Sequence, residues 1–385
     1  MRMRLFWQTR LRLLADWWWT IDRPLFLSIV ALAGLGYVMT FAASPLMAAK
    51  IGLPLYHFAA RQIVFLTLAL ATCLAVSLLT PRQVAQLALG VFVLSLLGLM
   101  LVLLVGHDVR GARRWLSLFG FSVQPSEFLK PGFMILTALL FARLAARRMS
   151  SLVPFVLLVF CALLLVAQPD IGQTVLLTLG WLMLLFLSGG SLWKLALPGA
   201  GLAGFLVFAW RTMPHVAARI DGFLNPALGE SYQTEQALSA IANGGVFGTG
   251  PGDGYYKAFL PDAHTDYVFA VLAEEGGLLI GGAVMGLFAL IVLRALARAS
   301  EARAHWVQLS VAGLVGLFGL QAAINLAVNL NLVPPKGMSL PFLSYGGSSL
   351  LATALSLGMV LALTRREIPK LPRPPAVVPQ REVMA

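Results

Sequence analysis

Ten separate apolar stretches dominate this chain of 385 residues. A helix that crosses a bilayer needs roughly 20 predominantly apolar residues, and the chain is 59% hydrophobic and only 11% charged. Soluble domains carry about 25% charged residues, so a large soluble domain is excluded. The predicted spans are 25–43, 63–79, 84–105, 128–145, 153–167, 171–189, 192–210, 267–293, 307–330 and 348–363. We therefore predict an all-α integral membrane protein with about ten transmembrane helices.

Basic residues predict the orientation of these spans. With both termini in the cytoplasm, most of the 28 Lys and Arg residues fall on the inner side, as cytoplasmic loops require. This orientation gives a cytoplasmic N-terminal arm (1–24), a ten-span domain (25–363) and a cytoplasmic tail (364–385). One large outer loop, 211–266, joins spans seven and eight. The net charge of +12 is then mostly topological, and no nucleic-acid partner is predicted.

Nucleotide and thiol chemistry find no support in the sequence. The phosphate-binding pattern GxxxxGK[ST] is absent, and the five histidines are scattered without paired spacing. Cys73 and Cys161 both lie in apolar stretches, where free Cys behaves as a small buried hydrophobe. ATP-driven pumping, a disulfide and a His-based metal site are therefore not expected.

The large outer loop carries two features that each allow two interpretations. Six glycines fall within 244–254, which fits either a pliable connector or a set of backbone N–H groups approaching a phosphate. Asp266 directly precedes the span that starts at Tyr267. It either caps that helix or acts as a general base whose pKa is raised by partial desolvation. A helix is predicted over 232–241.

Several cations break the positive-inside pattern and lie at the outer surface. Charge near a membrane is costly and usually faces a cavity or a partner, so these residues predict a cationic outer cavity with an anionic ligand. They are Arg110, Arg113, Arg114 and Lys130 around the loop between spans three and four, and Lys336 before the last span.

Two carboxylates share this outer level. Glu127 and Lys130 are three residues apart on one helix face, which fits an ion pair or a substrate-positioning pair. Asp170 lies in the tight turn between two spans and fits either a helix cap or a site residue. The segment 334–349, which includes Ser344, is too rich in Gly and Pro for a simple turn; such backbone is tolerated when it lines a wet cavity.

Five separated motifs together carry a resemblance to a known family. They are Arg113-Arg-Trp115, Gln124-Pro-Ser-Glu127, Gln168-Pro-Asp-Ile-Gly172, Leu260-Pro-Asp-Ala-His-Thr-Asp266 and Leu340-Pro-Phe-Leu-Ser-Tyr-Gly-Gly-Ser-Ser349. The chain resembles, from its first span to its last, the shape, elongation, division and sporulation (SEDS) family of bacterial cell-wall polymerases. Within that family, the segment 335–341 is more similar to the division branch (FtsW) than to the elongation branch (RodA).

The resemblance implies a peptidoglycan glycosyltransferase that polymerises lipid II at the outer face of the bacterial inner membrane, at the division septum. It also implies a class B penicillin-binding protein (an FtsI-like transpeptidase) and other divisome membrane proteins as partners. The family's essential Asp matches Asp266. Further matching positions, expected to bind substrate or balance the charge of its cavity, are Arg114, Glu127, Lys130, Asp170 and Lys336; His264 and Ser344 are added as candidates from the same motifs.

The expected chemistry needs one carboxylate. Asp266 would take the proton from the 4-hydroxyl of the acceptor N-acetylglucosamine, which attacks the muramyl anomeric carbon of the growing strand with inversion. The diphosphate leaves as an anion, whereas the alcohol released by a glycosidase must be protonated by a second carboxyl group. Fixed cations or a divalent cation, Mg²⁺ or Mn²⁺, would stabilise the leaving charge. Glu127 and Asp170 would order those cations or hold the metal, and His264 would orient Asp266.

Three other functions stay open on the sequence. A lipid II flippase or another polyprenyl-lipid transporter also needs about ten spans and a charged cavity, but it needs no outer base. An elongation (RodA-type) polymerase would share the site. A non-catalytic division scaffold would tolerate replacement of Asp266.

Overall fold

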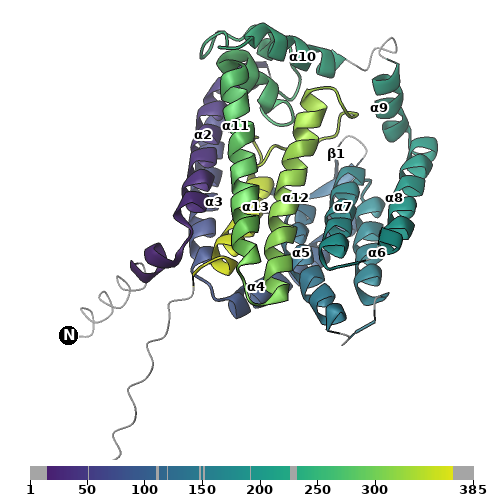
Figure 1. Cartoon of the computed structure of the whole chain (residues 1–385). Coiled ribbons are helices and arrows are strands. Elements are labelled where there is room, and N and C mark those ends of the chain that lie inside the picture. The colour runs from purple at the N-terminus through teal and green to yellow at the C-terminus, as the bar shows by residue number, and fades with distance from the viewer. Residues whose placement is uncertain are drawn as a thin grey trace, which may run out of the picture.

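The computed structural model describes residues 15–366, except for 51, 110–111, 119, 147–148, 151, 191 and 226–231. Its long helices run roughly parallel to one another in a bundle (Figure 1). Ten of them are apolar: α2 (Arg23–Lys50), α3 (His57–Ser77), α4 (Pro81–Val105), α5 (Pro125–Ala145), α6 (Leu152–Ala167), α7 (Ile171–Leu187), α8 (Leu192–Thr212), α11 (Val268–Ser300), α12 (His305–Asn329) and α13 (Gly347–Leu363).

These helices coincide with the ten predicted spans, and the all-α membrane fold is confirmed. Seven of them are long and apolar enough to cross a membrane, while α6, α7 and α13 are shorter apolar helices. The shortness of α13 fits its place, because it packs against α3, α5 and α12 and buries most of its residues inside the bundle. In contrast, α8 lies at the side of the bundle and contacts α7 and α9.

A small sheet replaces the simple outer loop expected between the third and fourth spans. It is antiparallel, in the order β1 (His107–Val109), β2 (Ala112–Leu118), β3 (Phe121–Val123). Leu118 pairs with Phe121, and Gly120 takes φ +80° in the tight turn between them, a conformation that glycine adopts without steric cost. The hairpin places β2, which carries Arg114, next to the start of α5.

The large outer loop is folded over the end of the bundle. It contains α9 (Pro214–Leu224), α10 (Tyr232–Gly244) and the short 3₁₀ helix η2 (Tyr256–Ala258). The predicted helix over 232–241 is confirmed by α10. Both α9 and α10 lie at the end of the bundle opposite the start of α2 (Figure 1).

The glycine-rich segment after α10 packs against the backbone of α11. A Cβ on Gly244 would lie 2.0 Å from the Ala273 carbonyl oxygen, and one on Gly248 would lie 2.1 Å from the Glu275 carbonyl oxygen. The helix is interrupted there, because Gly277 has φ +70°. Neither predicted interpretation of the glycines holds: the segment is pinned rather than pliable, and it is absent from the lining of the large cavity described below.

Glu274, a residue of α11, binds the residues on both sides of this glycine-rich segment. Its carboxylate is fully buried and accepts hydrogen bonds from the backbone N–H groups of Tyr256 (2.7 Å) and Lys257 (3.0 Å) and from the Asn243 amide (3.1 Å). Lys257 in turn pairs with Glu275. A charge at this depth requires such partners, so the outer loop is fixed to α11 just after the helix begins.

Adding a methyl group at Gly244 should therefore damage the outer loop. We expect Gly244→Ala to lower the free energy of unfolding by about 3 kcal/mol, because the contact is with backbone that cannot move aside. Gly282→Ala is the matched control, since a Cβ there meets nothing within 4 Å and removing a glycine from a helix favours folding. The midpoint of thermal unfolding in detergent should fall for Gly244→Ala and hold or rise for Gly282→Ala; equal midpoints would contradict this packing.

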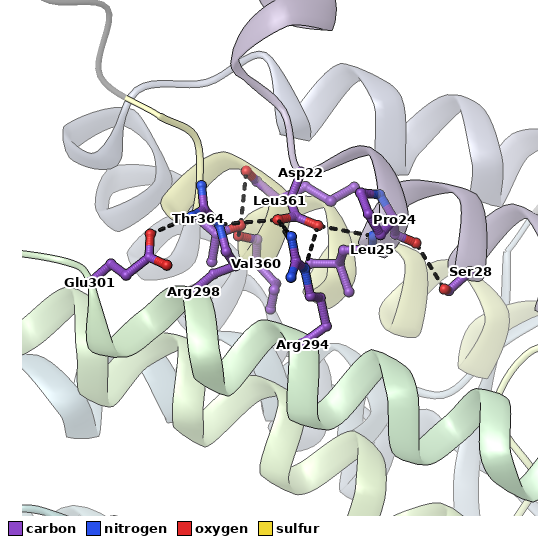
Figure 2. Close-up of polar contacts among 10 residues, drawn as sticks. All are labelled: Asp22, Pro24, Leu25, Ser28, Arg294, Arg298, Glu301, Val360, Leu361 and Thr364. Carbon is purple, nitrogen blue, oxygen red and sulfur yellow. Dashed lines mark hydrogen bonds and ion pairs between the residues drawn. The ribbon is translucent and has the colours of Figure 1, made fainter.

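The opposite end of the bundle is tied by an ion cluster (Figure 2). Asp22, just before α2, accepts from Arg294 (2.9 Å) and pairs with Arg298 (3.0 Å), both on α11. Figure 2 shows Glu301 on the far side of Arg298, with which it also pairs. The segment before α2 also contacts the segment after α13, because the backbone N–H of Arg366 donates to the carbonyl of Thr20.

Removing the Asp22 charge should destabilise this end. The Asp22 side chain is 1% exposed, and a buried pair that loses one partner leaves an uncompensated charge, so Asp22→Asn should cost about 3 kcal/mol. Glu301→Gln should cost under about 1 kcal/mol, because the Glu301 side chain is 62% exposed and screened by water. Thermal unfolding of the two variants in detergent should separate them; similar midpoints would show that the cluster contributes little.

Candidate active site

A cavity of about 780 Å³ opens at the end of the bundle covered by α9 and α10. Its volume is typical of small-molecule sites. The wall is built from β2, the starts of α5 and α7, helix α9, the turn before α11 and the segment before α13. Its charged lining residues are Arg114, Arg219, Lys336, Glu127, Asp170, Asp262 and Asp266.

Asp266 is presented to this cavity by a tight turn. The carbonyl of Asp262 accepts the backbone N–H groups of Thr265 (3.0 Å) and Asp266 (3.1 Å), and Asp262 takes φ +53°, which Asp tolerates better than most residues. The N-cap of α11 is Tyr267, which makes no side-chain capping bond. The structure therefore does not support Asp266 as the cap of α11.

The Asp266 carboxylate lies beside the segment that carries Lys336. A Cβ on Gly337 would be 3.5 Å from Asp266 Oδ2, and Lys336 lines the same cavity. Burial lowers the pKa of Lys336, and the nearby Arg219 guanidinium lowers it further. The carboxylate and this cation thus share one wall, although they are far apart in the sequence.

Arg219 was missed by the sequence analysis. It lies on α9 with His215, one turn earlier, and both line the cavity. Burial lowers the pKa of His215, and Arg219 adds to the effect. The only available signal was the spacing of four, which places two basic side chains on one face of a helix.

Arg114 and Asp170 form a second unit of the cavity wall. Arg114 Nη1 lies 3.7 Å from Asp170 Oδ1, and Arg114 also donates to the Pro169 carbonyl. Asp170 caps α7 by accepting from the Gln173 backbone N–H, so it is both a cap and a cavity residue. Burial raises the pKa of Asp170, and the Arg114 charge opposes that rise.

Glu127 and Lys130 form the predicted ion pair. Their charged atoms are 2.8 Å apart and both side chains are buried. Gln173 donates to Glu127 (2.6 Å), and Lys130 donates to Gln321 (2.9 Å). Glu127 lines the cavity, whereas Lys130 lies outside its lining. This position favours the charge-balancing role of Lys130 over direct contact with a diphosphate.

His264 and Ser344 support the turn that carries Asp266 and do not line the cavity. The His264 ring lies 5.1 Å from that of Phe58 and 5.7 Å from that of Tyr345, measured between centroids. Ser344 donates to the Thr265 carbonyl and accepts from the Leu340 N–H (2.7 Å). Neither residue is part of the cavity lining, so the structure favours support of the turn over contact with a ligand.

The electrostatic character of the cavity differs from the prediction. Three cationic side chains and four carboxylates line it, so the expected cationic cavity is wrong as a description of the whole lining. Arg114 pairs with Asp170, and Glu127 with Lys130. The cations Lys336 and Arg219 line the same cavity as the two carboxylates of the outer turn, Asp262 and Asp266.

The residues present do not form a metal cage. No group of three or more His, Cys, Asp or Glu side chains is placed to hold a metal ion within the described parts of 15–366. Mg²⁺ is commonly bound by one or two carboxylates together with substrate phosphates. A divalent cation in this cavity would therefore need ligands from the substrate.

Comparison with known proteins gives a consistent match over nearly the whole chain. A family model described as "Cell cycle protein", which covers FtsW, RodA and SpoVE, matches residues 23–368. A Caulobacter vibrioides protein named "Probable peptidoglycan glycosyltransferase FtsW" is 42% identical over 357 residues, which is 91% of this chain and 90% of that protein. A Coxiella burnetii protein of the same name is 36% identical over 90% of this chain and 96% of that protein.

Solved structures share the fold. One, from work on the structural coordination of polymerization and crosslinking by a peptidoglycan synthase complex, has a TM-score of 0.73 and 30% identity, covering 89% of this chain and 97% of that chain. The crystal structure of the rod shape determining protein RodA from Thermus thermophilus has a TM-score of 0.67 and 29% identity, covering 89% and 96%.

Proposed function

The chain belongs to the family of FtsW, RodA and SpoVE cell cycle proteins and is a peptidoglycan glycosyltransferase of cell division, and we propose that Asp266 is the general base of its reaction. One observation carries this proposal: the Asp266 carboxylate lines a large cavity beside Gly337, in the wall that also holds Lys336. A base and a cation in one cavity are what transfer from a diphosphate-linked sugar requires.

Lipid II is the proposed substrate. The cavity is large enough for a sugar and a diphosphate, while a polyprenyl chain would stay in the surrounding lipid. The predicted topology places the cavity outside the cytoplasm, where nucleotide sugars are lacking, and the sequence has no nucleotide-binding motif. A donor anchored in the membrane fits this predicted topology and the missing nucleotide motif.

In the proposed reaction, the charged groups act on the acceptor and on the leaving group. Asp266 accepts the proton of the acceptor 4-hydroxyl, whose oxygen forms a bond to the muramyl anomeric carbon of the growing strand. The bond from that carbon to the diphosphate oxygen breaks, and the diphosphate leaves with the electron pair. Lys336 and Arg219 stabilise the developing negative charge. No protonation of the leaving group is needed, so one carboxylate is sufficient.

The two ion pairs of the cavity wall support this chemistry without taking part in it. Arg114 with Asp170, and Lys130 with Glu127, fix the cavity wall between β2, α5 and α7. A divalent cation, Mg²⁺ or Mn²⁺, stays a proposal without an assigned step, because the described residues offer no cage for it.

A class B penicillin-binding protein and the division septum are the proposed partner and location. The partner is supported by the likeness to a solved peptidoglycan synthase complex. The septal location is supported by the FtsW relatives. A transpeptidase beside the polymerase would cross-link each strand as it emerges, and other divisome proteins would control the pair.

Purified full-length protein with its partner, supplied with lipid II in detergent, tests the proposed function. Glycan polymer should form, because a polymerase needs no compartments. A lipid II flippase would yield no polymer in detergent but would move labelled lipid II across a vesicle membrane. Transport without polymer would contradict the polymerase.

A further inference from the structure

Three amide side chains follow one face of α12: Gln321, Asn325 and Asn329. We call this set the amide stripe. The spacing of four places them above one another on the helix, and all three are buried, with Asn329 fully so. Polar side chains inside a membrane helix are costly and need partners. The hydrogen-bond partners of these three amides indicate their role.

Asn325 and Asn329, the two members of the stripe nearest the C-terminal end of α12, bind the backbone of Asp266. Asn325 Nδ2 donates to the Asp266 carbonyl at 2.8 Å, and Asn329 Nδ2 donates to the same oxygen at 3.0 Å. A carbonyl oxygen has two lone pairs, so the two amides satisfy it completely. Asn329 Oδ1 also accepts from the Ala270 N–H at 3.1 Å. The turn that presents Asp266 and the first turn of α11 are thereby held by α12.

The same stripe binds the segment that follows Lys336. Asn325 Nδ2 also donates to the Met338 carbonyl at 2.7 Å, and Gln321 Nε2 donates to the Ser339 carbonyl at 2.9 Å. Gln321 Oε1 accepts from Lys130. Asn325 therefore bridges the two outer segments, and it does so through backbone atoms.

We propose that the amide stripe sets the distance between the Asp266 carboxylate and the Lys336 segment, with Asn325 as the central positioning residue. This inference rests on the proposed function of Asp266. The stripe touches no reacting atom, because its bonds are to backbone groups, to Lys130 and between its own members. It acts by fixing the backbone from which both charged side chains extend, and such alignment strongly affects rate.

The kinetic test uses the full-length protein with its partner and lipid II. Asn325→Ala should lower kcat by about 10- to 100-fold, as expected for misplacement on the ångström scale, with KM within a factor of about three because the lining side chains remain. Asn329→Ala should cost more in the Asn325→Ala background than in wild type, because it then removes the remaining amide donor from the Asp266 carbonyl. Asn325→Ser keeps a donor and should give an intermediate kcat.

Gln308→Ala is the matched control. Gln308 lies on the same helix at the opposite end of the bundle and donates to a backbone carbonyl, that of Ala302, at 2.7 Å. This variant removes an equivalent bond far from the cavity. Its kcat and KM should equal those of wild type, so a loss in Gln308→Ala equal to that in Asn325→Ala would overturn the positioning role.

Amide hydrogen exchange separates this inference from the assignment of the base. Peptides covering 262–271 should exchange roughly tenfold faster in Asn325→Ala, because two carbonyls lose a donor and the turn opens locally. They should be unchanged in Gln308→Ala. Unchanged exchange in Asn325→Ala would overturn the inference, even if the variant misfolds elsewhere. Faster exchange with a fully active Asp266→Asn would leave the inference intact and overturn the proposed base.

Discussion

Asp266→Asn should lose polymerase activity on lipid II by roughly 10³-fold, within the range of about 10²- to 10⁴-fold that a general base contributes. Asparagine has the size of aspartate but cannot accept the proton of the attacking hydroxyl. The turn should survive, because it is held by the Asp262 carbonyl and by bonds to the Asp266 backbone. The rate of glycan formation at saturating lipid II measures the loss.

Binding and stability controls separate this loss from damage to the cavity. Asp266→Asn should bind lipid II about as tightly as wild type and unfold at a similar temperature, because asparagine has the size of aspartate and the bonds to the Asp266 backbone remain. A variant that polymerises at the wild-type rate would rule out Asp266 as the base.

Lys336→Ala should lower kcat/KM by about 10²- to 10³-fold, the usual effect of removing one group that stabilises developing negative charge. Lys194→Ala should have no effect, because Lys194 is exposed at the start of α8, outside the cavity lining. Polymerisation rates across lipid II concentrations give the comparison. Equal rates for Lys336→Ala and Lys194→Ala would contradict the role of Lys336.

The pH dependence adds a signature for Lys336. Its pKa is lowered by burial and by Arg219, so it loses its proton at a lower pH than an ordinary lysine. Activity that needs this charge should therefore fall earlier on the alkaline side. Lys336→Arg keeps its charge at every accessible pH and should move the alkaline limit of kcat/KM upward. An alkaline limit that is unchanged in Lys336→Arg would assign that titration to another group.

Local patterns predicted the membrane architecture well. Hydrophobic stretches mark spans because burial in lipid depends on composition along each segment, and the ten predicted segments all became helices. The Glu127–Lys130 pair was also predictable, since residues three apart on a helix are neighbours. The family resemblance, not the spacing, identified Asp266 among the outer carboxylates.

Long-range relationships were beyond the sequence patterns. Nothing local places Asp266 beside Gly337, or Arg219 near Lys336, because these contacts depend on how α9, α11 and α12 pack. The role of the glycine-rich segment was predicted wrongly for the same reason. Its glycines allow close approach to the backbone of α11, and the local sequence does not show which helix packs there.

One signal in the sequence was available and unused. Gln321, Asn325 and Asn329 are amides at a spacing of four within a largely apolar span, and polar groups in a membrane helix are retained only with partners. The pattern could have predicted a buried polar face on α12. It could not have predicted that the partner is the Asp266 carbonyl.

The most direct test of the proposed mechanism compares the two carboxylates of the outer turn. Asp262 and Asp266 line the same cavity, four residues apart, and Asn tolerates the left-handed backbone at position 262 as well as Asp does. Single-turnover polymerisation of bound lipid II should be nearly abolished in Asp266→Asn, while Asp262→Asn keeps most of its rate. An Asp266→Asn variant that turns over bound lipid II as fast as Asp262→Asn would contradict Asp266 as the base.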